Sequence, residues 1–241
     1  MRRPPDVDPA ASTAEFQRTT GGERYGVDEL ASAGPGIPPS TARRILDVVV
    51  SVMALVLLWP LLVTAMIVVR IDCPGPSLYR QVRVGQGGHR FMLYKLRTMR
   101  VDRSGPEITA LSDPRVTRVG AFLRRTSLDE LPQLVNVLRG QMTLVGPRPE
   151  TLVLARRYPV EYRWIFNHRP GLTGPCQTRC RDRTQLPPGI IDIEYYYLCY
   201  LLPQRVALDE WYLRQPTLRR TMRMLWDTAR HLAGRPLRPL R

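Results

Sequence analysis

The sequence predicts an α+β protein, in which a re-entrant membrane helical hairpin precedes a mainly helical cytosolic domain with a small β-hairpin. Three observations support this fold class. One apolar run, Ile45–Val69, is long enough to enter a membrane. Two segments rich in β-prone residues flank a glycine-rich loop. Later segments show the three- and four-residue spacing of helices and are separated by turns rich in Pro and Gly.

The composition is basic and favours a polyanionic partner. The 241 residues include 36 Lys and Arg against 21 Asp and Glu, which gives a formal net charge of +15. Such a surplus indicates nucleic acid, an anionic membrane surface or phosphate-bearing substrates. Four cysteines are too few for a disulfide scaffold, and a hydrophobic content of 44% excludes a wholly disordered chain.

Residues 1–40 read as a disordered tail. They contain six Pro and five Gly but few large apolar side chains. They also carry four Arg against six acidic residues, so the positive surplus lies downstream. No apolar segment closely follows Arg2 and Arg3, which argues against a signal peptide. A second flexible tail is expected over 233–241.

Residues 41–72 are expected to form the membrane helix. As one straight helix, Ile45–Val69 would measure roughly 37 Å, which exceeds a hydrocarbon core of about 30 Å. Pro60 lies within this run, where it bends or breaks a helix. Basic residues, which prefer the cytoplasmic side, flank both ends; they are Arg43, Arg44 and Arg70. We therefore expect the helix to enter the membrane and return at Pro60, with a kinked crossing helix as the alternative.

Residues 73–232 form the predicted catalytic domain. Its first elements are two strands, Ser77–Val84 and Arg90–Lys95. Gly85–Gly88 joins them as the loop of a β-hairpin. The polar stretch 101–115 reads as a loop, because it contains two turn-forming proline pairs.

Three helices are expected in the rest of the domain. Leu131–Leu138 ends at Gly140, and a second helix near 151–166 is interrupted at Pro159. Thr217–Leu232 forms a basic amphipathic helix, suited either to a membrane surface or to the outside of the domain with its stripe in the core. The stripe consists of Leu218, Met222, Leu225, Ala229 and Leu232.

The densest group of reactive side chains lies in residues 124–132. A carboxylate there can act as a nucleophile or hold Mg²⁺, and guanidinium groups can clamp phosphate. Ser127 and Glu130 also match the S-x-x-E capping box. However, such a cap would put Pro132 at the fifth helical position, where its missing N–H is unfavourable. A helix that opens near Pro132 instead leaves Asp129 and Glu130 before it, in its positive field.

Two cations stand out by their setting. Arg148 lies between Pro147 and Pro149, which stiffen the backbone and suit it to bidentate phosphate contact. The alternative is a plain turn with an exposed Arg. Lys95 is the one Lys among the 36 basic residues. A coding preference for Arg explains the bias, but a surviving Lys indicates a position that needs a compact ammonium beside a phosphate or carboxylate.

The cysteines offer a weaker alternative. Cys176 and Cys180, with His168 and Cys199, could be taken for a zinc site. Their spacing does not match the common structural zinc sites. Free thiols in a cytosol-facing domain are therefore expected.

Together these segments resemble the bacterial sugar transferases, the monotopic polyprenyl-phosphate phosphoglycosyl transferases, in a small catalytic-core form. The resemblance runs from about Arg43 to Trp226, and the acidic block in combination with the Gly-Pro-Arg-Pro turn is highly specific. The motifs that carry it are Ile45–Asp47, Asp72–Pro76, Tyr79–Gln81, Arg83–Gly85, Tyr94–Met99, Leu123–Leu134, Val145–Pro149, Arg169–Gly174 and Asp209–Tyr212.

The resemblance implies transfer of a sugar-1-phosphate from a nucleotide sugar, UDP-linked, to a membrane polyprenyl phosphate, with release of UMP. This is the first membrane step of surface polysaccharide or glycoconjugate assembly. Asp129 is the implied nucleophile toward the β-phosphate and forms a covalent phosphosugar intermediate. Glu130 assists at the Mg²⁺ or in proton handling, so both carboxylates are candidate metal ligands.

The candidate phosphate- and substrate-binding residues are Lys95, Arg97, Arg124, Arg148 and Gln177. The resemblance also supports a re-entrant helix with its break at Pro60. Two departures are visible. Trp59 precedes Pro60 where the family often has Ser, and Pro175 follows Gly174 where the family usually has Trp. Gln177 still aligns, and the second change bears on sugar or nucleotide selectivity.

The expected partners are a nucleotide sugar, polyprenyl phosphate and the anionic inner leaflet of a bacterial cytoplasmic membrane, with the catalytic domain on the cytosolic face. A homodimer is left open, and nucleic acid is not expected. A competing hypothesis is a non-enzymatic, membrane-anchored basic module that binds anionic lipid or nucleic acid. It explains the charge but not the acidic pair or the Arg148 turn. A third has the lipid phosphate attack directly, without an enzyme intermediate.

Overall fold

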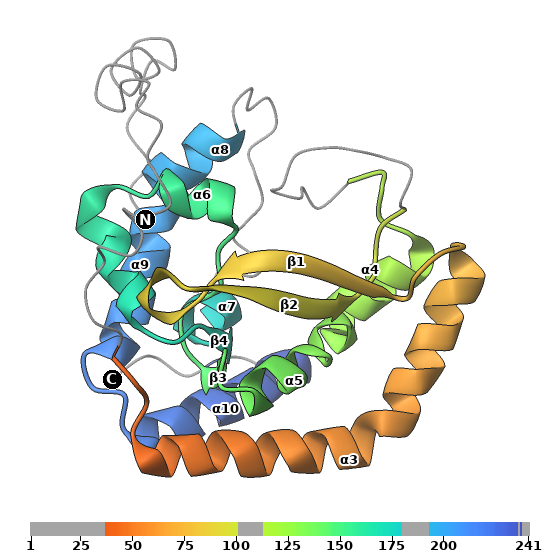
Figure 1. Ribbon diagram of the computed structural model, residues 1–241, viewed down its shortest axis with the longest axis horizontal. Coiled ribbons are helices and arrows are strands. Elements are labelled where there is room, and N and C mark those ends of the chain that lie inside the picture. Colours follow the sequence, from red (N-terminus) through yellow and green to blue (C-terminus); the bar gives the residue numbers. More distant parts are fainter. Residues whose placement is uncertain (1–36, 101–112, 180–192, 236, 238–241) are drawn as a thin grey trace.

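A long helix and a β-hairpin frame the domain (Figure 1). The computed structural model describes residues 37–100, 113–179, 193–235 and 237. Most of the expected N-terminal tail, most of the expected loop 101–115, Cys180 and most of 233–241 lie outside the described residues.

Helices and small sheets alternate along the chain, which confirms the α+β class. The elements are α3 (Thr41–Asp72), β1 (Leu78–Val84), η1 (Gln86–Gly88), β2 (Arg90–Leu96), α4 (Arg118–Thr126), η2 (Leu128–Glu130), α5 (Gln133–Leu138), β3 (Thr143–Val145), α6 (Leu152–Arg156), η3 (Val160–Asn167), β4 (Gly171–Thr173), α7 (Pro175–Arg179), α8 (Ile193–Tyr196), η4 (Tyr197–Leu201), α9 (Leu202–Leu213) and α10 (Leu218–Leu232).

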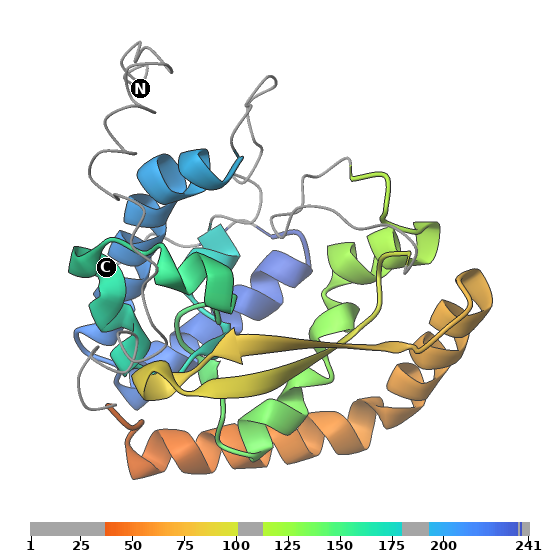
Figure 2. The ribbon, with the colours of Figure 1, turned by 45° about the horizontal axis from the view of Figure 1, so that its top comes forward.

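The predicted β-hairpin is confirmed. Strands β1 and β2 pair antiparallel, from Leu78 opposite Leu96 to Val84 opposite Arg90. Gly87 in the connecting turn has a φ of 65°, in the left-handed region where glycine meets no Cβ penalty. Helix α5 lies between this hairpin and α3 (Figures 1 and 2).

The expected helices in the middle of the domain are also present. Helix α5 begins after Pro132, and Gly140, with a φ of 76°, follows its C-terminus. Pro159 separates α6 from the 3₁₀ segment η3, at the interruption that the sequence predicts.

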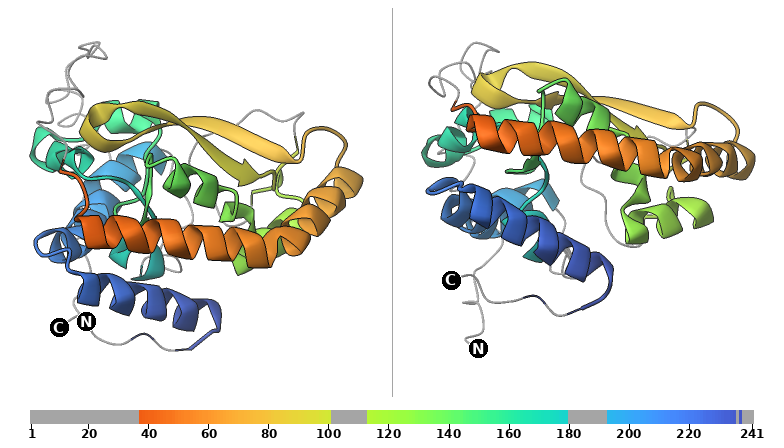
Figure 3. Two further views of the ribbon diagram at one scale, coloured as in Figure 1. Left: turned by 60° about the horizontal axis from the view of Figure 1, so that its bottom comes forward. Right: turned by 90° about the horizontal axis from the view of Figure 1, so that it is seen from below.

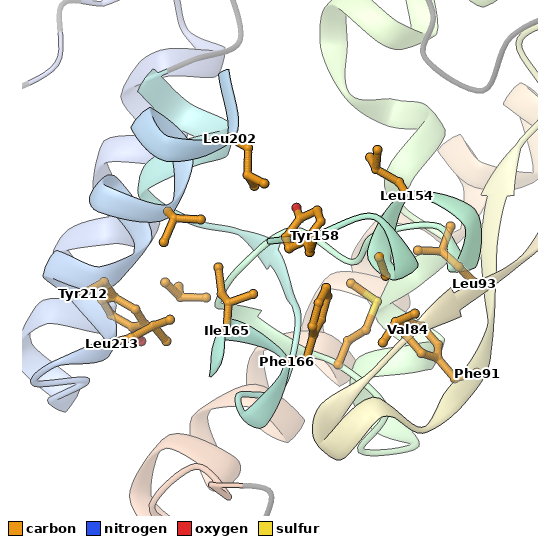
Figure 4. Packing of buried hydrophobic residues seen from close by; sticks show 14 of the residues in the cluster. Val84, Phe91, Leu93, Leu154, Tyr158, Ile165, Phe166, Leu202, Tyr212 and Leu213 are labelled. Atoms are coloured by element: carbon orange, nitrogen blue, oxygen red, sulfur yellow. The ribbon is translucent and has the colours of Figure 1, made fainter. Parts of the chain in front are cut away.

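The main hydrophobic core lies between the hairpin, α6, η3 and α9 (Figure 4). Buried side chains of the two strands meet those of η3, and α9 closes the other side. Ten of its members are Val84, Phe91, Leu93, Leu154, Tyr158, Ile165, Phe166, Leu202, Tyr212 and Leu213. Strands β3 and β4 form a second, parallel pair, with Thr143 opposite Gly171.

Helix α3 differs from the expected hairpin. It continues through Pro60 as one helix, bent along the base of the domain, instead of folding back into two antiparallel segments (Figures 1 and 3). Proline removes one backbone donor and kinks a helix without having to end it. The hydroxyl of Thr64 donates to the Pro60 carbonyl at 2.8 Å. The re-entrant path therefore stays a prediction.

In the part of the chain that the structure describes, α3 is the one helix long and apolar enough to cross a membrane. Only 11% of its most apolar window is buried within the protein. Its exposed apolar side chains are Ile45, Val49, Val52, Met53, Val56, Leu57, Trp59, Leu61, Val63, Ile67, Val68 and Ile71. Such a continuous apolar surface is typical of contact with a membrane or another protein.

The first turns of α3 belong to the domain, although the sequence places them in the membrane run. The buried Asp47 carboxylate accepts from the Thr143 hydroxyl at 2.7 Å and from the Leu144 N–H at 2.9 Å. The buried Arg43 guanidinium donates to the Val145 carbonyl at 3.0 Å. These contacts attach the helix to β3.

Helix α10 lies beside α3 on the same face of the domain (Figure 3). It buries Thr221, Met224 and Asp227 against the domain. Most of the apolar stripe expected from the sequence points away from the core, so the core-stripe alternative is wrong. The exposed large apolar side chains of α10 are Leu218, Met222, Trp226 and Leu232.

The attachment of α3 to β3 predicts that Asp47→Ala destabilises the protein by roughly 2–5 kcal/mol, because two buried donors lose their acceptor. Val49→Ala, two residues away on the exposed face, is the control and is expected to change stability by no more than about 0.5 kcal/mol. Unfolding monitored in detergent checks both, and equal stability of the two variants would contradict this account.

Candidate active site

The acidic pair lies on a single 3₁₀ turn, Leu128–Glu130, between α4 and α5. Ser127 does not cap this turn; it ends α4 in the left-handed region, with a φ of 58°. Pro132 occupies the N-cap position of α5. The capping-box alternative is therefore wrong, and the acidic residues precede the helix as expected. Asp129 is buried, whereas the Glu130 side chain is partly exposed.

The setting of Asp129 makes its carboxylate unusually basic. Burial, and then the charge of Glu130, raise its pKa to about 6 against the opposing effects of Lys95 and Arg124. At neutral pH the group is still mostly ionised. A desolvated carboxylate with a raised pKa and adjacent cations is typical of a functional site.

Lys95 lies across the hairpin from Tyr79, with its Nζ 5.3 Å from the centre of the Tyr79 ring. Burial lowers its pKa to about 8, while the charge of Asp129 acts in the opposite direction. Three neighbouring cations lower it further: Arg124, Arg83 and Arg148. The structure therefore places the single Lys within a cluster of positive charge that faces the acidic pair.

Arg124 reaches this cluster from the last turn of α4. Its Nε donates to the Thr98 hydroxyl at 2.8 Å, just beyond the end of β2. A Cβ at Gly120 would lie 2.1 Å from the Thr98 carbonyl oxygen, so only glycine allows α4 this close to the strand. Burial lowers the pKa of Arg124, and the charge of Asp129 opposes that shift.

Arg148 reaches the pair from the loop after β3. Its Nη1 lies 4.0 Å from Oε1 of Glu130, and about half of the side chain is exposed. Backbone carbonyls on both sides of Arg148 are bound by neighbouring segments. These bonds join Gly171 N to Pro147 O (2.7 Å), Arg83 Nη1 to Pro149 O (3.1 Å) and Val84 N to Glu150 O (3.0 Å). The loop presents one solvent-accessible cation on a fixed backbone.

Two of the sequence-predicted binding residues serve the scaffold. Arg97 is buried and donates to the carbonyls of Cys73 and Pro74, so it holds the end of α3 against β2. The Gln177 Nε2 lies 3.4 Å from the Gly146 carbonyl oxygen, next to the Arg148 loop. The structure thus brings together Asp129 with Glu130, Lys95, Arg124 and Arg148, but holds Arg97 on other partners.

Sequence reasoning missed Arg83 and Glu150. Strand alternation puts Arg83 on the same face of the hairpin as Lys95, a signal that the register of a hairpin provides. Glu150 directly follows the Arg148 turn and is buried. A buried carboxylate has no signature in a polar turn, because its partners lie far along the chain.

The acidic pair offers the carboxylate ligands that Mg²⁺ takes when it binds together with a phosphate-bearing molecule. Such an ion takes one or two carboxylates and completes its shell with phosphate oxygens and water. No group of three His, Cys, Asp or Glu side chains suitable for a metal occurs among the described residues. Cys176 is buried, and its backbone N–H donates to Asp209 at 3.1 Å.

Comparison with known proteins identifies related sequences. The family model described as bacterial sugar transferase matches residues 39–235. The chain is 41% identical over 211 residues to the UDP-glucose:undecaprenyl-phosphate glucose-1-phosphate transferase of Caulobacter vibrioides. The aligned residues cover 83% of this chain and 74% of the relative.

Two further relatives cover different shares of the chain. A putative undecaprenyl-phosphate N-acetylgalactosaminyl 1-phosphate transferase of Bacillus subtilis is 44% identical over 133 residues, 54% of this chain and 70% of the relative. The exopolysaccharide production protein PSS of Rhizobium leguminosarum is 36% identical over 196 residues, 77% of this chain and 92% of the relative.

The raised pKa of Asp129 predicts that Asp129→Asn stabilises the metal-free protein. A shift from 3.8 to about 6 means that the ionised carboxylate costs the folded state roughly 3 kcal/mol above pH 6. The gain in the variant should be full above pH 6 and should shrink as the pH falls from 6 toward 4, where both states bind the proton.

Thermal unfolding in EDTA at several pH values measures this gain. Asp113→Asn is the contrasting variant, because its hydrogen bond to Arg115 lowers the pKa of Asp113, and it should lose stability at neutral pH. A loss of stability in Asp129→Asn at pH 7.5 would refute the description of the acidic pair.

Proposed function

The chain belongs to the bacterial sugar transferase family, and on that premise we propose that it transfers a sugar-1-phosphate from a UDP-sugar to a membrane polyprenyl phosphate and releases UMP. The named activities of its relatives support the general reaction. The observation that carries the proposal is the setting of Asp129, a buried, basic carboxylate beside Glu130 and facing Lys95 and Arg124.

In the first step, an Asp129 carboxylate oxygen attacks the β-phosphorus of the UDP-sugar. The bond between that phosphorus and the oxygen bridging to the α-phosphorus breaks, and UMP leaves with the bridging oxygen. An aspartyl phosphosugar forms. In the second step, a phosphate oxygen of the polyprenyl phosphate attacks the same phosphorus, and the bond to Asp129 breaks. The product is polyprenyl-diphosphate-sugar and the carboxylate is restored.

The cations suit phosphoryl transfer, which depends on positioning and on charge stabilisation. Lys95 offers a compact ammonium beside Asp129, and Arg124 is aimed by its bond to Thr98. Arg148, on its fixed loop, is able to grip phosphate oxygens in a bidentate manner. Each compensates negative charge that spreads over the oxygens as the phosphoryl group moves.

Glu130 is the carboxylate that we assign to Mg²⁺, because it is more exposed than Asp129 and leaves the nucleophile free. A bound Mg²⁺ would neutralise diphosphate charge and orient the leaving group. Glu130 also raises the pKa of Asp129, which makes the attacking oxygen more basic. Arg148, 4.0 Å away, balances the Glu130 charge.

The exposed apolar faces of α3 and α10 support a membrane location on the cytosolic leaflet. Both helices lie on one side of the domain (Figure 3), which suits a surface that rests on lipid. The basic residues near both ends of α3 favour a re-entrant path, with the domain held at the interface where a polyprenyl phosphate exposes its head group.

The covalent mechanism predicts that Asp129→Asn abolishes UMP release, because an amide oxygen is a poor nucleophile toward phosphorus. The assay uses membranes or detergent-solubilised protein, a panel of UDP-sugars and added polyprenyl phosphate with Mg²⁺. Glu161→Gln, an exposed carboxylate elsewhere in the domain, is the matched control and should retain wild-type rates.

Two results would redirect the proposal. Substantial turnover by Asp129→Asn, together with no trapped phosphosugar in the wild type by mass spectrometry, would favour direct attack by the lipid phosphate. No UMP release by the wild type, with salt-sensitive nucleic-acid binding, would favour a non-enzymatic basic module.

The re-entrant path predicts that both ends of the intact chain lie on the same, cytosolic side. Tags at the N-terminus and the C-terminus should show equal protease accessibility in sealed vesicles of one orientation. Protection of one tag alone would establish a crossing helix.

A further inference from the structure

A buried carboxylate lies behind the Arg148 loop. Glu150 is only 7% exposed, although it directly follows the Pro-Arg-Pro turn. Its Oε1 accepts hydrogen bonds from the Tyr158 hydroxyl at 3.0 Å and the Tyr197 hydroxyl at 2.7 Å. Arg205 donates to the Tyr197 hydroxyl at 3.0 Å, and its guanidinium lies over the Tyr197 ring at 4.8 Å.

These partners come from separate parts of the chain. Tyr158 follows α6, Tyr197 opens the π-helical turn η4, and Arg205 lies on α9. π-helical turns are uncommon and often mark functional positions. Burial and the charge of Glu150 raise the pKa of both tyrosines, so both remain hydrogen-bond donors across the physiological range. The network therefore ties the Arg148 loop to the C-terminal helices.

Little open space lies beside the network. Glu150, Tyr158, Tyr197 and Arg205 border a cavity of about 20 Å³, which Arg148 also lines. That volume accommodates about one water molecule and no nucleotide or sugar. We therefore expect these groups to act on the reaction through the loop.

We propose that Glu150 is a positioning residue that aims Arg148 at the transferred phosphate, through its bonds to Tyr158 and Tyr197. The inference rests on the proposed function of Arg148. Backbone hydrogen bonds hold the path of the loop. The Glu150 side chain anchors the end of the loop, two residues after Arg148. A charged acceptor binds the two hydroxyls more strongly than a neutral one would. Loss of the Glu150 charge weakens these hydrogen bonds and lets the end of the loop shift.

The test is a double-mutant cycle between Glu150→Gln and Arg148→Ala, read as kcat and KM for UMP release. Glu150→Gln should lower kcat about 10- to 100-fold, since small misplacements of a catalytic group have effects of this size. In the Arg148→Ala background the same change should have an effect of less than about twofold, because both substitutions remove one function. Independent, multiplicative losses would overturn the proposal.

Hydrogen exchange of the free protein gives a second readout that needs no activity. Glu150→Gln and Tyr197→Phe should both speed amide exchange at Gly146, Arg148 and Glu150 under conditions in which the protein stays globally folded. The matched control is Tyr200→Phe, on the same π-helical turn, whose ring stacks on Tyr196 at 5.1 Å. Unchanged exchange in the loop would overturn the proposal.

The two readouts separate this inference from the proposed function. If no UMP is released at all, the proposed function fails; if Arg148→Ala is as active as the wild type, only the proposed role of Arg148 fails. Loop exchange then still decides whether Glu150 orders the loop. If Arg148→Ala is impaired and Glu150→Gln is not, the positioning role alone is refuted.

Discussion

The buried attachment of α3 to β3 is the constraint on which the rest of the structure depends. Asp47 binds Thr143 and the Leu144 N–H, while Arg43 binds the Val145 carbonyl. The next residues along the chain form the loop that carries Arg148. Buried hydrogen bonds therefore join the long apolar helix to the strand that leads into the Arg148 loop. In the reaction that we propose, the polyprenyl phosphate lies in the bilayer, and this attachment would set the height of the site above the membrane.

The second feature of the structure is that like charges lie close together at the site. Asp129 is buried beside another carboxylate, and Lys95 is desolvated among three arginines. Each group departs from its ordinary pKa in the direction that disfavours its charged form, so the apoprotein is destabilised there. The diphosphate and Mg²⁺ of the proposed reaction would supply charges of both signs and relieve this repulsion. The main core and the bonds of the Arg148 loop maintain the geometry that the local electrostatics oppose.

Much of the fold could be predicted from the sequence because its signals are local. The hairpin follows from alternation and a glycine-rich loop, and α10 follows from its three- and four-residue spacing. The position of Pro132 was enough to place Asp129 and Glu130 before α5. Arg97 was harder, because its carbonyl partners come from the end of α3. A sequence motif that contains a cation does not reveal whether backbone or substrate is its partner.

The sequence by itself determined which side chains are available: an acidic pair before a proline-started helix, one lysine, a stiff arginine turn and a long apolar segment. Those features depend on neighbouring residues and on backbone chemistry. Only the tertiary structure decided that Glu150 is buried against two tyrosines and that the apolar stripe of α10 faces outward. Each of these depends on contacts between segments far apart in the chain, and such contacts are set by packing and burial, which leave no local pattern.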